Sequence, residues 1–344
     1  MKTIVAHAAH DLRIEEREAG HAGPGQVEIA IKAGGICGSD LHYYQHGGFG
    51  AVRIREPMIL GHEVAGQITR LGDGVTGFVV GDRVAVSPSR PCNACRFCLE
   101  GLQNQCLNMR FYGSAMVMPH IQGAFRQTLI AESWQCHRIA DGVSFNLAAF
   151  AEPFAVTLHA VRRAGSLLGK RVLISGCGPI GALTIIAARA HGAEEIVVTD
   201  VMDQVLEKGV EVGADRSINV ASNGEELAAL SADKGYFDVQ FECSGNERAV
   251  RSGLEVLRPR GTLVQLGLGG DMAVPQNMIV SKEIEVCGSF RFHEEFALAV
   301  DLINRGRVDL SPLLTGIFPI EDAVAAFDLA GDRSKAMKVQ LSFD

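Results

Sequence analysis

The fold is indicated by one stretch of the chain, Arg171-Val172-Leu173-Ile174-Ser175-Gly176-Cys177-Gly178-Pro179-Ile180-Gly181. Its apolar residues predict a buried strand, and the residues from Ala182 to about His191 predict a helix. Between a strand and a helix, Gly-x-Gly-x-x-Gly is typical of a loop that binds a dinucleotide. Gly176 permits the tight turn, Gly178 lets the backbone approach a pyrophosphate, and Gly181 lets the helix pack closely on the strand.

Two features next to these glycines support a dinucleotide site. Pro179 suits a first helical turn, where its missing N–H is not needed, and the helix N-terminus offers N–H groups to a phosphate. Asp200 ends the next predicted strand, where a carboxylate accepts hydrogen bonds from ribose hydroxyls and repels a 2′-phosphate. We therefore expect NAD rather than NADP, bound by Gly176, Gly178, Pro179, Ile180, Gly181 and Asp200. The alternative is a glycine-rich turn that binds nothing.

The residues around this loop alternate between strands and helix-length connections. This rhythm predicts a parallel, doubly wound sheet with helices on both faces, and therefore an α/β protein. The expected strands are Arg171–Ser175, Glu195–Asp200, Ser217–Val220, Phe237–Cys243, Thr262–Gly267 and Ile284–Ser289.

The chain before about residue 145 has a different pattern, with short β-type runs broken by glycine, such as 27–32 and 81–86. After the doubly wound part, 296–305 and 320–330 have helical periodicity and lead to a last strand at 338–341. We expect a β-rich domain formed by 1–149 and 290–344, with an NAD-binding domain, 150–289, inserted in it.

Composition excludes several other classes of protein. The 344 residues are 47% hydrophobic and 21% charged, unlike a disordered chain. The net charge of −8 and the scattered Lys and Arg argue against nucleic acid and anionic membranes as partners. The N-terminal residues become polar too early for a secretion signal, and no run is long enough to span a bilayer. We expect a cytoplasmic protein that acts on a small molecule.

Four of the nine cysteines fall in one short stretch, at Cys92, Cys95, Cys98 and Cys106. Four thiolates at this spacing can surround one ion tetrahedrally, and such a site suits a structural zinc because it leaves no open position. An iron–sulfur cluster also uses four cysteines, and unligated cysteines are the third interpretation.

A second set of metal-binding residue types is spread more widely. Cys37 and His62 would each also fit an ordinary core, as a small hydrophobe and a hydrogen-bonded histidine. Together with Glu152, at the boundary between the two predicted domains, they provide three ligands and one vacancy, the arrangement of a catalytic zinc. Glu63 is adjacent, and it would support the ligands or exchange with water as a ligand itself.

A zinc ion beside a nicotinamide would lower the pKa of a bound alcohol, so that hydride transfer occurs near neutral pH. The released proton needs a path to solvent. Ser39 and His42, a hydroxyl and an imidazole shortly after Cys37, are the predicted relay. The alternative is that Ser39 caps a helix and His42 is merely exposed.

These motifs together resemble the zinc-dependent medium-chain alcohol dehydrogenases, in the polyol branch that includes sorbitol, xylitol and threonine dehydrogenases. The likeness rests on five segments in the family order: 35–43, 57–63, the cysteine cluster, 152–153 and 176–181. The resemblance implies a GroES-like catalytic domain, a Rossmann domain, one catalytic and one structural zinc per subunit, and a homotetramer. It also implies Cys37, His62, Glu152 and Glu63 as the catalytic-metal set, and Ser39 and His42 as the relay.

A narrower likeness, to the sugar-acid dehydrogenases of this branch, rests on 108–116, 119–120, 150–153, 235–239 and 288–292. Sorbitol dehydrogenases have tyrosine where Phe292 stands, so a hydroxyl that could hold a neutral polyol is missing. The carboxylate of a sugar acid calls for a cation, preferably arginine. Candidate substrate contacts are Arg110 and Arg291, with Tyr43 and His120 as neighbours. The alternatives are a sorbitol, xylitol or L-threonine dehydrogenase and a non-catalytic NAD-binding protein.

Overall fold

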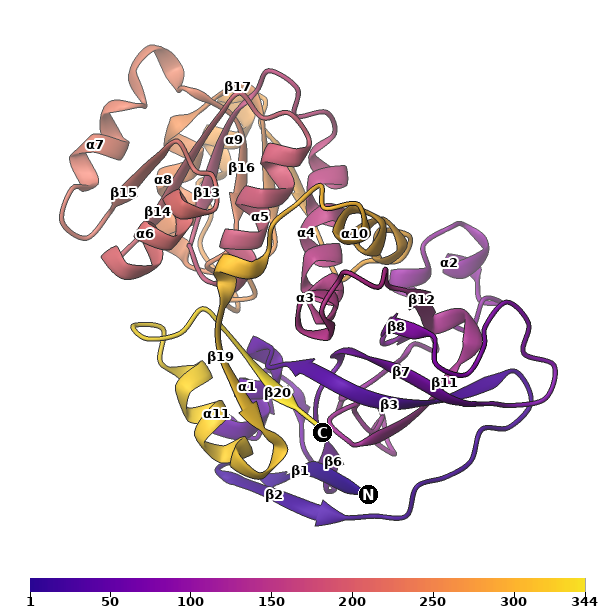
Figure 1. Ribbon diagram of the computed structural model, residues 1–344. Helices are drawn as coiled ribbons and strands as arrows, with labels where there is room; N and C mark the ends of the chain where they lie inside the picture. The colour runs from indigo at the N-terminus through magenta and orange to yellow at the C-terminus, as the bar shows by residue number, and fades with distance from the viewer. Residues whose placement is uncertain (344) are drawn as a thin grey trace. The chain divides into compact units, whose positions relative to one another are not determined.

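The computed structural model describes residues 1–343, which divide into two compact units (Figure 1). The first unit contains Met1–Glu152, Phe296–Gly306 and the stretch from Leu314 onward, and the second contains Pro153–Glu295 and Arg307–Leu313. The assignment of a catalytic domain to 1–149 with 290–344, and of an NAD-binding domain to 150–289, is a statement about function and stays a prediction.

The second unit is built on a six-stranded parallel sheet in the order β15-β14-β13-β16-β17-β18. This is the strand order of a Rossmann fold, in which the first strand lies at the centre, so the predicted α/β class is confirmed. The strands are β13 Arg171–Ser175, β14 Glu195–Asp200, β15 Arg216–Asn219, β16 Phe237–Glu242, β17 Leu257–Gln265 and β18 Glu285–Gly288. The helices between them are α5 Pro179–Ala190, α6 Asp203–Glu211, α7 Gly224–Ala229, α8 Glu247–Val256 and α9 Gln276–Lys282 (Figure 1).

One strand of this sheet differs clearly from its predicted bounds. β17 begins at Leu257, five residues before the predicted start at Thr262. Leu257 pairs with Phe237, and the register then shifts before Thr262 pairs with Val239. Arg260 takes a left-handed backbone conformation, φ 61°, at this irregularity. The sequence Pro259-Arg260-Gly261 therefore reads as a loop, although the chain continues in the sheet on both sides of it.

The first unit is built on a mostly antiparallel sheet in the order β12-β8-β7-β3-β20-β19, with β11 also paired to β3. These strands are β3 Gln26–Gly35, β7 Glu63–Leu71, β8 Arg83–Val86, β11 Thr128–Glu132, β12 Cys136–Arg138, β19 Leu314–Pro319 and β20 Lys338–Ser342. The other strands of the unit are β1 Lys2–Ala8, β2 Asp11–Glu16, β4 Gly48–Phe49, β5 Val52–Arg53, β6 Met58–Ile59, β9 Ser89–Arg90 and β10 Arg110–Phe111. The C-terminal strand β20 thus returns to the N-terminal sheet beside β3.

Six further α-helices within residues 1–343 lie outside the parallel sheet and its connections. They are α1 Gly38–His46, α2 Arg96–Leu99, α3 Phe145–Ala149, α4 Ala151–Ala164, α10 Glu295–Asn304 and α11 Ala323–Gly331. Three of them, α1, α2 and α4, carry predicted site residues. The core of the first unit joins β3, β7 and β20 to α11 through buried side chains such as Ile31, Val64, Phe327 and Leu341. The second unit has its own core around Leu173, and each unit therefore holds its site residues on a separately packed scaffold.

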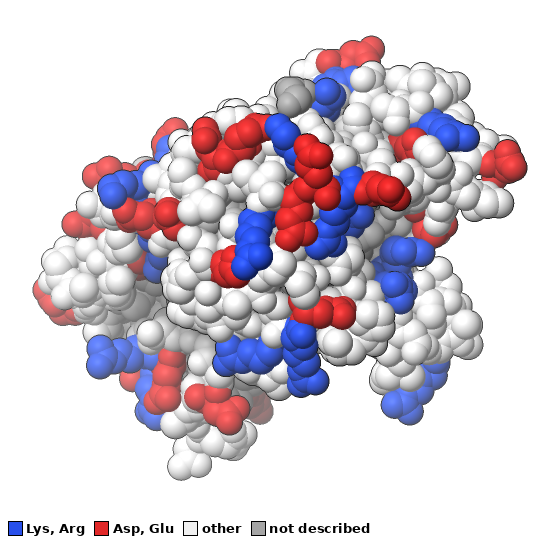
Figure 2. Space-filling view, turned by 90° about the horizontal axis from the view of Figure 1, so that it is seen from below, with Lys and Arg blue, Asp and Glu red and all other residues white. Residues whose placement is uncertain are grey.

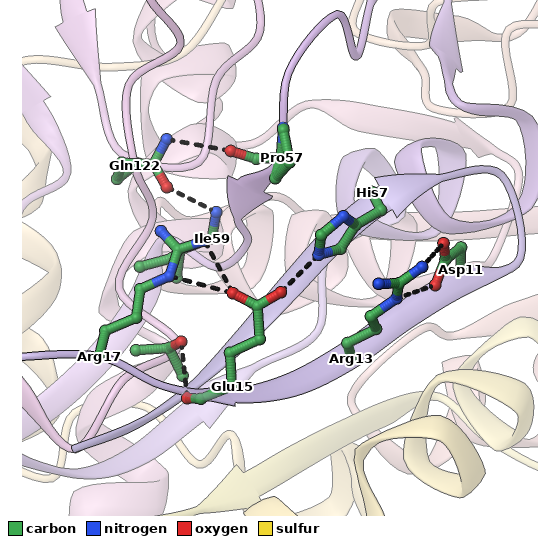
Figure 3. A network of polar contacts seen from close by, with 9 residues as sticks. His7, Asp11, Arg13, Glu15, Arg17, Pro57, Ile59 and Gln122 are labelled. Carbon is green, nitrogen blue, oxygen red and sulfur yellow. Dashed lines mark hydrogen bonds and ion pairs between the residues drawn. The ribbon is translucent and has the colours of Figure 1, made fainter.

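A polar network covers one side of the β1–β2 hairpin (Figure 3). The Glu15 carboxylate lies between His7 and Arg17 and accepts hydrogen bonds from both side chains. The hydrogen bond with His7, and after it that with Arg17, outweigh partial burial and lower the pKa of Glu15. Arg13 forms a bidentate pair with Asp11 on the same hairpin. These charges pair among themselves and contribute no predicted site residue.

The molecular surface agrees with the scattered charge of the sequence. On the face shown in Figure 2, basic and acidic side chains are interspersed and the basic ones do not gather in one area. None of the helices within residues 1–343 combines the length and the apolar character needed to cross a membrane.

A buried carboxylate fixes the start of α10. The side chain of Glu295 is 4% exposed and accepts hydrogen bonds from His159 Nδ1 at 3.1 Å and from the backbone N–H of His293 at 3.0 Å. Burial alone would raise the pKa of Glu295, but these hydrogen bonds outweigh it and lower the pKa to about 2. The ionised form of Glu295 therefore stabilises the folded state.

We expect Glu295→Gln to lower the free energy of unfolding by about 2 kcal/mol at pH 7, because the folded protein prefers the charged side chain. The pKa of Glu295 is lowered on folding, so its contribution is complete above the unfolded pKa of about 4.5 and disappears as the pH falls through about 2. Urea unfolding at pH 7, 5, 4 and 3 measures the difference from the unmodified protein. A difference that stays constant over this range would show that the charge of Glu295 does not contribute.

Candidate functional site

The first cluster of site residues lies where β3 ends and β7 begins. Cys37 is the N-cap of α1, directly after β3, and His62 immediately precedes β7. The two strands are antiparallel, and Gly35 of β3 pairs with Glu63 of β7. This register brings together residues that are far apart in sequence. The ligand atoms of Cys37, His62 and Glu63 all lie within 4.8 Å of one another.

Asp40 holds the two ligand-bearing segments in place. Its side chain is fully buried, with Oδ2 accepting a hydrogen bond from the backbone N–H of Cys37 and Oδ1 from that of Gly61, each at 3.1 Å. Burial raises the pKa of Asp40. Asp40 is not among the site residues predicted from the sequence, although a carboxylate three residues after the N-cap of a helix is a known capping pattern.

His62 does not behave as an ordinary core histidine. Its Nδ1 atom is buried and has no hydrogen-bond partner within residues 1–343; the nearest carboxylate oxygen, Asp40 Oδ1, is 3.8 Å away. Buried polar atoms in proteins nearly always have partners. A buried ring nitrogen without a hydrogen-bond partner, next to a thiol and a carboxylate, fits a metal ligand better than a structural residue.

The charges around Cys37 also fit a dication. Burial, and then the neighbouring Glu63, raise the pKa of the Cys37 thiol to about 12. Glu152, in the first turn of α4, is 5% exposed, and burial raises the pKa of its carboxyl group to about 8, with further upward effects from Glu63 and Cys37. Without a metal, several acidic groups would have to share one buried space. A divalent ion lets them ionise together, because it supplies the missing positive charge.

Glu63 and Glu152 differ in their surroundings. Glu63 lies in the tight group with Cys37 and His62, and both of its carboxylate oxygens also accept hydrogen bonds from Lys338 Nζ at 2.8 Å. Glu152 lies outside that group of three, although its pKa responds to each member of it. Nothing in the sequence identifies Lys338, because its partner precedes it by 275 residues.

Ser39 and His42 lie one turn apart on α1, the helix that Cys37 begins. Ser39 is inside the helix and does not cap it, because the N-cap is Cys37. His42 is exposed, and its ring lies 5.9 Å from that of Phe49. Partial burial, and then the neighbouring His46, lower the pKa of His42. His42 is thus an exposed imidazole on the helix that Cys37 begins, and its pKa lies below the ordinary value.

The four-cysteine segment forms a second metal-type cluster. The sulfur atoms of Cys92, Cys95, Cys98 and Cys106 all lie within 4.8 Å of one another. Backbone N–H groups point at them, as in Cys92 N to Cys106 Sγ at 3.1 Å and Cys95 N to Cys92 Sγ at 3.3 Å. Backbone hydrogen bonds, first that from Ala94, lower the pKa of Cys92 to about 6, whereas burial raises that of Cys98 to about 12. The donor set and the N–H···S contacts fit a tetrahedral zinc.

The four candidate substrate contacts have different environments. Tyr43 is buried and its hydroxyl accepts a hydrogen bond from the backbone N–H of Ala115. His120 is buried too, with Nε2 accepting from the backbone N–H of Arg55 and Nδ1 donating to the Val117 carbonyl. These hydrogen bonds fix the loop that contains residues 115–120.

The two arginines among these candidates lie in different units. Arg110 is exposed and adjoins Phe111, whose ring lies 5.5 Å from that of His62. Arg291 belongs to the second unit, where its guanidinium lies over the ring of Phe290 and its backbone is left-handed, φ 54°. Phe292, which stands where sorbitol dehydrogenases have tyrosine, is fully buried.

The glycine loop of the second unit has the geometry expected from its sequence. Gly176 has φ 89°, and α5 begins at Pro179 with Gly178 as its N-cap. A Cβ atom on Gly181 would lie 1.9 Å from the carbonyl oxygen of Gly176, so helix and loop touch through their backbones. A Cβ atom on Gly178 would meet nothing within 4 Å. The space in front of the helix N-terminus is therefore open to a ligand, which fits a dinucleotide phosphate.

Asp200 and Glu242 both shape this loop. Asp200 Oδ2 accepts a hydrogen bond from the backbone N–H of Cys177 at 2.8 Å, so the predicted ribose-binding carboxylate also fixes the loop. Glu242 is fully buried and accepts hydrogen bonds from the backbone N–H groups of Ser244 and Gly245. Ser244 in turn packs against Gly176. Glu242 is not among the predicted site residues, because its local sequence is that of an ordinary strand end.

Comparison with known proteins gives the family. Residues 23–141 match the alcohol dehydrogenase GroES-like domain and residues 179–305 match the zinc-binding dehydrogenase family. The chain is 46% identical, over 92% of its length and 91% of the relative, to L-idonate 5-dehydrogenase (NAD(P)(+)) of Escherichia coli K12. The chain belongs to the zinc-binding dehydrogenases.

Other relatives of this zinc-binding dehydrogenase come from the same branch. Sorbitol dehydrogenase of Gallus gallus is 35% identical over 99% of this chain and 96% of the relative. The crystal structure of L-idonate 5-dehydrogenase from Escherichia coli superimposes with a TM-score of 0.95 at 43% identity, covering 99% of this chain and 97% of that one. The resemblance to the zinc-dependent, polyol-type dehydrogenases and the predicted GroES-like and Rossmann folds are thus confirmed.

The second and third glycines of the loop, Gly178 and Gly181, provide a matched pair of variants. Gly181→Ala should lower the free energy of unfolding by about 1–3 kcal/mol, because its new methyl group collides with the Gly176 carbonyl. Gly178→Ala should leave stability unchanged and weaken NADH binding about tenfold, because its methyl group occupies only the open space before the helix. Thermal unfolding and NADH fluorescence titration measure the two effects. Full NADH affinity in Gly178→Ala would exclude a phosphate at this position.

Asp200→Asn separates the charge of this side chain from its hydrogen bond to the loop. The amide oxygen can still accept from the backbone N–H of Cys177, but the second oxygen, which accepts from the Val201 N–H, and the negative charge that repels a 2′-phosphate are lost. We expect the ratio of NADPH to NADH affinity to rise about tenfold or more. Fluorescence titration with both reduced cofactors measures this, and an unchanged ratio would remove Asp200 from cofactor selection.

Proposed function

We propose that this chain catalyses the reversible, NAD-linked oxidation of a secondary hydroxyl of a sugar acid, converting L-idonate to 5-keto-D-gluconate. The observation that carries the proposal is the meeting of Cys37, His62 and Glu63 within 4.8 Å, next to the buried Glu152. The choice of L-idonate is supported by the 46% identity to L-idonate 5-dehydrogenase. In the reaction the alcohol loses a hydride to NAD and a proton to solvent, giving the ketone and NADH.

The residues of the first unit would have two roles in this reaction, metal binding and proton transfer. Cys37 and His62, with Glu63 or Glu152, would hold a zinc ion, which as a Lewis acid lowers the pKa of an alcohol. Ser39 and His42, one turn apart on α1, would carry the proton from the alcohol to solvent. The lowered pKa of His42 suits this role because a neutral imidazole can accept a proton.

The other candidate residues would bind the remaining groups. Cys92, Cys95, Cys98 and Cys106 would hold a structural zinc. The glycine loop of the second unit and Asp200 would bind NAD, which supplies the hydride acceptor. The exposed Arg110, and Arg291 in the second unit, are the cations proposed for the substrate carboxylate. Tyr43 and His120 would act by holding the loop around residues 114–120.

The proposal includes two broader statements from the sequence. The polyol branch commonly forms homotetramers, and we propose the same for this chain. We also propose that it acts in the cytoplasm, with a small molecule as its only substrate beside NAD.

A second candidate function is oxidation of a neutral polyol. It is favoured by the 35% identity to sorbitol dehydrogenase over nearly the whole chain, and the same metal site would serve it. The two candidates differ in the charge of the substrate, because only a sugar acid gives an arginine a carboxylate to bind.

The test is a substrate panel combined with removal of metal. With NAD, kcat/KM should be highest for L-idonate, lower for sorbitol and xylitol, and lowest for L-threonine. Arg110→Ala should lower kcat/KM for L-idonate about tenfold or more and spare sorbitol, because it removes one charge-assisted contact. Incubation with a chelator should abolish turnover of every substrate. Higher kcat/KM for sorbitol or threonine rejects the sugar-acid assignment, and turnover that survives loss of both metals rejects the zinc mechanism.

A further inference from the structure

Lys338 carries a positive charge in the interior of the first unit. It is the first residue of β20, and its side chain is 3% exposed. Its ammonium group donates to both oxygens of Glu63 at 2.8 Å and to the Ile36 carbonyl at 3.1 Å. All three N–H groups are used, and both acceptor residues directly adjoin a proposed metal ligand: Ile36 precedes Cys37, and Glu63 follows His62.

The strand register shows that this ion pair is built into the sheet. Gly35 of β3 pairs with Glu63 on one side and with Gln340 of β20 on the other. Lys338 and Glu63 therefore come from the two strands that flank β3. A Cβ atom on Gly35 would lie 2.1 Å from Glu63 Oε2, so the carboxylate occupies the space that a side chain on β3 would fill. The absence of a side chain at Gly35 lets Glu63 reach Lys338.

The same carboxylate lies among the metal-type ligands. The ligand atom of Glu63 is within 4.8 Å of those of Cys37 and His62, while Lys338 holds both of its oxygens. A carboxylate that accepts hydrogen bonds from an ammonium group is a weaker electron donor to a metal ion. The lysine charge also opposes the approach of a dication, and the low dielectric of a buried site strengthens this repulsion.

We propose that Lys338 is a positioning residue that sets the strength of Glu63 as a metal ligand. By sharing the carboxylate, Lys338 would hold Glu63 beside Cys37 and His62 and would make it a weak ligand that a metal ion can release. By fixing the Ile36 carbonyl, it also holds the backbone that presents Cys37. The inference rests on the metal site of the proposed function. It adds that a residue of the C-terminal strand β20 regulates the metal affinity of that site.

If the ion pair had only a structural role, a different change in metal affinity would be expected. Removing one partner of a buried pair leaves an uncompensated charge and destabilises the fold, but a structural role gives no reason for metal affinity to rise. If Lys338 weakens Glu63, removing the lysine charge must strengthen metal binding, and removing the glutamate charge must weaken it. The sign of the change in affinity therefore separates the two roles, independently of any catalytic activity.

The experiment uses cobalt(II), whose absorption reports thiolate coordination, added to full-length protein whose four-cysteine cluster is filled with zinc. Cys37→Ser identifies the absorption that belongs to the Cys37 site. Competition with a chromophoric chelator then gives cobalt affinity for the unmodified protein, Lys338→Met, Lys338→Gln, Lys338→Arg, Glu63→Gln and the double variant Lys338→Met/Glu63→Gln. Lys338→Gln keeps a hydrogen-bond donor for Glu63 without the charge, and it is the deciding variant if Lys338→Met does not fold.

We expect the neutral variants of Lys338 to bind cobalt about tenfold more tightly or better, as expected for loss of one nearby buried charge, and Glu63→Gln to bind it about tenfold more weakly. Lys338→Arg should stay near the unmodified protein. Loss of the lysine charge should matter less when Glu63 is already neutral. Cobalt affinity that is unchanged or lower in the neutral variants, with the Cys37 absorption present, overturns the role of Lys338 alone. If the unmodified protein shows no Cys37-dependent absorption, the metal site of the proposed function fails and this inference fails with it.

Discussion

The hydrogen bonds between Lys338 and Glu63 are the interaction on which the arrangement of the first unit depends. A lysine and a glutamate that are nearly excluded from water are tolerated only when they pair closely. Their pairing requires β20 to lie beside β3, and it requires β7 on the other side of β3 to begin at Glu63. The same arrangement brings Cys37 and His62 together. A chain that ended before β20 would leave Glu63 buried without its cation.

In both units, a glycine without a side chain lets a polar group approach the backbone closely. In the first unit, Gly35 gives the Glu63 carboxylate room to cross the strand. In the second unit, Gly181 lets α5 approach the Gly176 carbonyl, and the open N-cap at Gly178 leaves the helix N-terminus accessible. Both sites use the missing side chain for space, because a polar group must reach its partner through a packed interior.

The two cysteine sites differ in how the surrounding groups shift the pKa values of their thiols. In the four-cysteine cluster, backbone N–H groups approach the sulfur atoms and lower the pKa of Cys92 to about 6. Around Cys37, burial and the Glu63 charge raise the thiol pKa to about 12. The backbone of the cluster thus favours the thiolate of Cys92, whereas burial raises the pKa of Cys98 to about 12, so that this thiol, like Cys37, ionises more readily beside a cation. The Cys37 site depends on added positive charge, as suits a metal with an exchangeable ligand.

The sequence alone determined the features that are local. A strand, three spaced glycines and a helix identify the nucleotide-binding loop because all of them lie within about twenty residues, and four cysteines in one stretch identify the second metal cluster for the same reason. Cys37, His62, Glu152 and Glu63 were predicted as a set of metal-binding residues, partly because the chain resembles a known family. The tertiary structure alone decided which side chains touch. It showed that Glu63 joins Cys37 and His62, that Asp40 fixes their backbones, and that Lys338 shares Glu63. Strand register in a sheet couples residues hundreds of positions apart, and no local pattern records which strand will lie beside which.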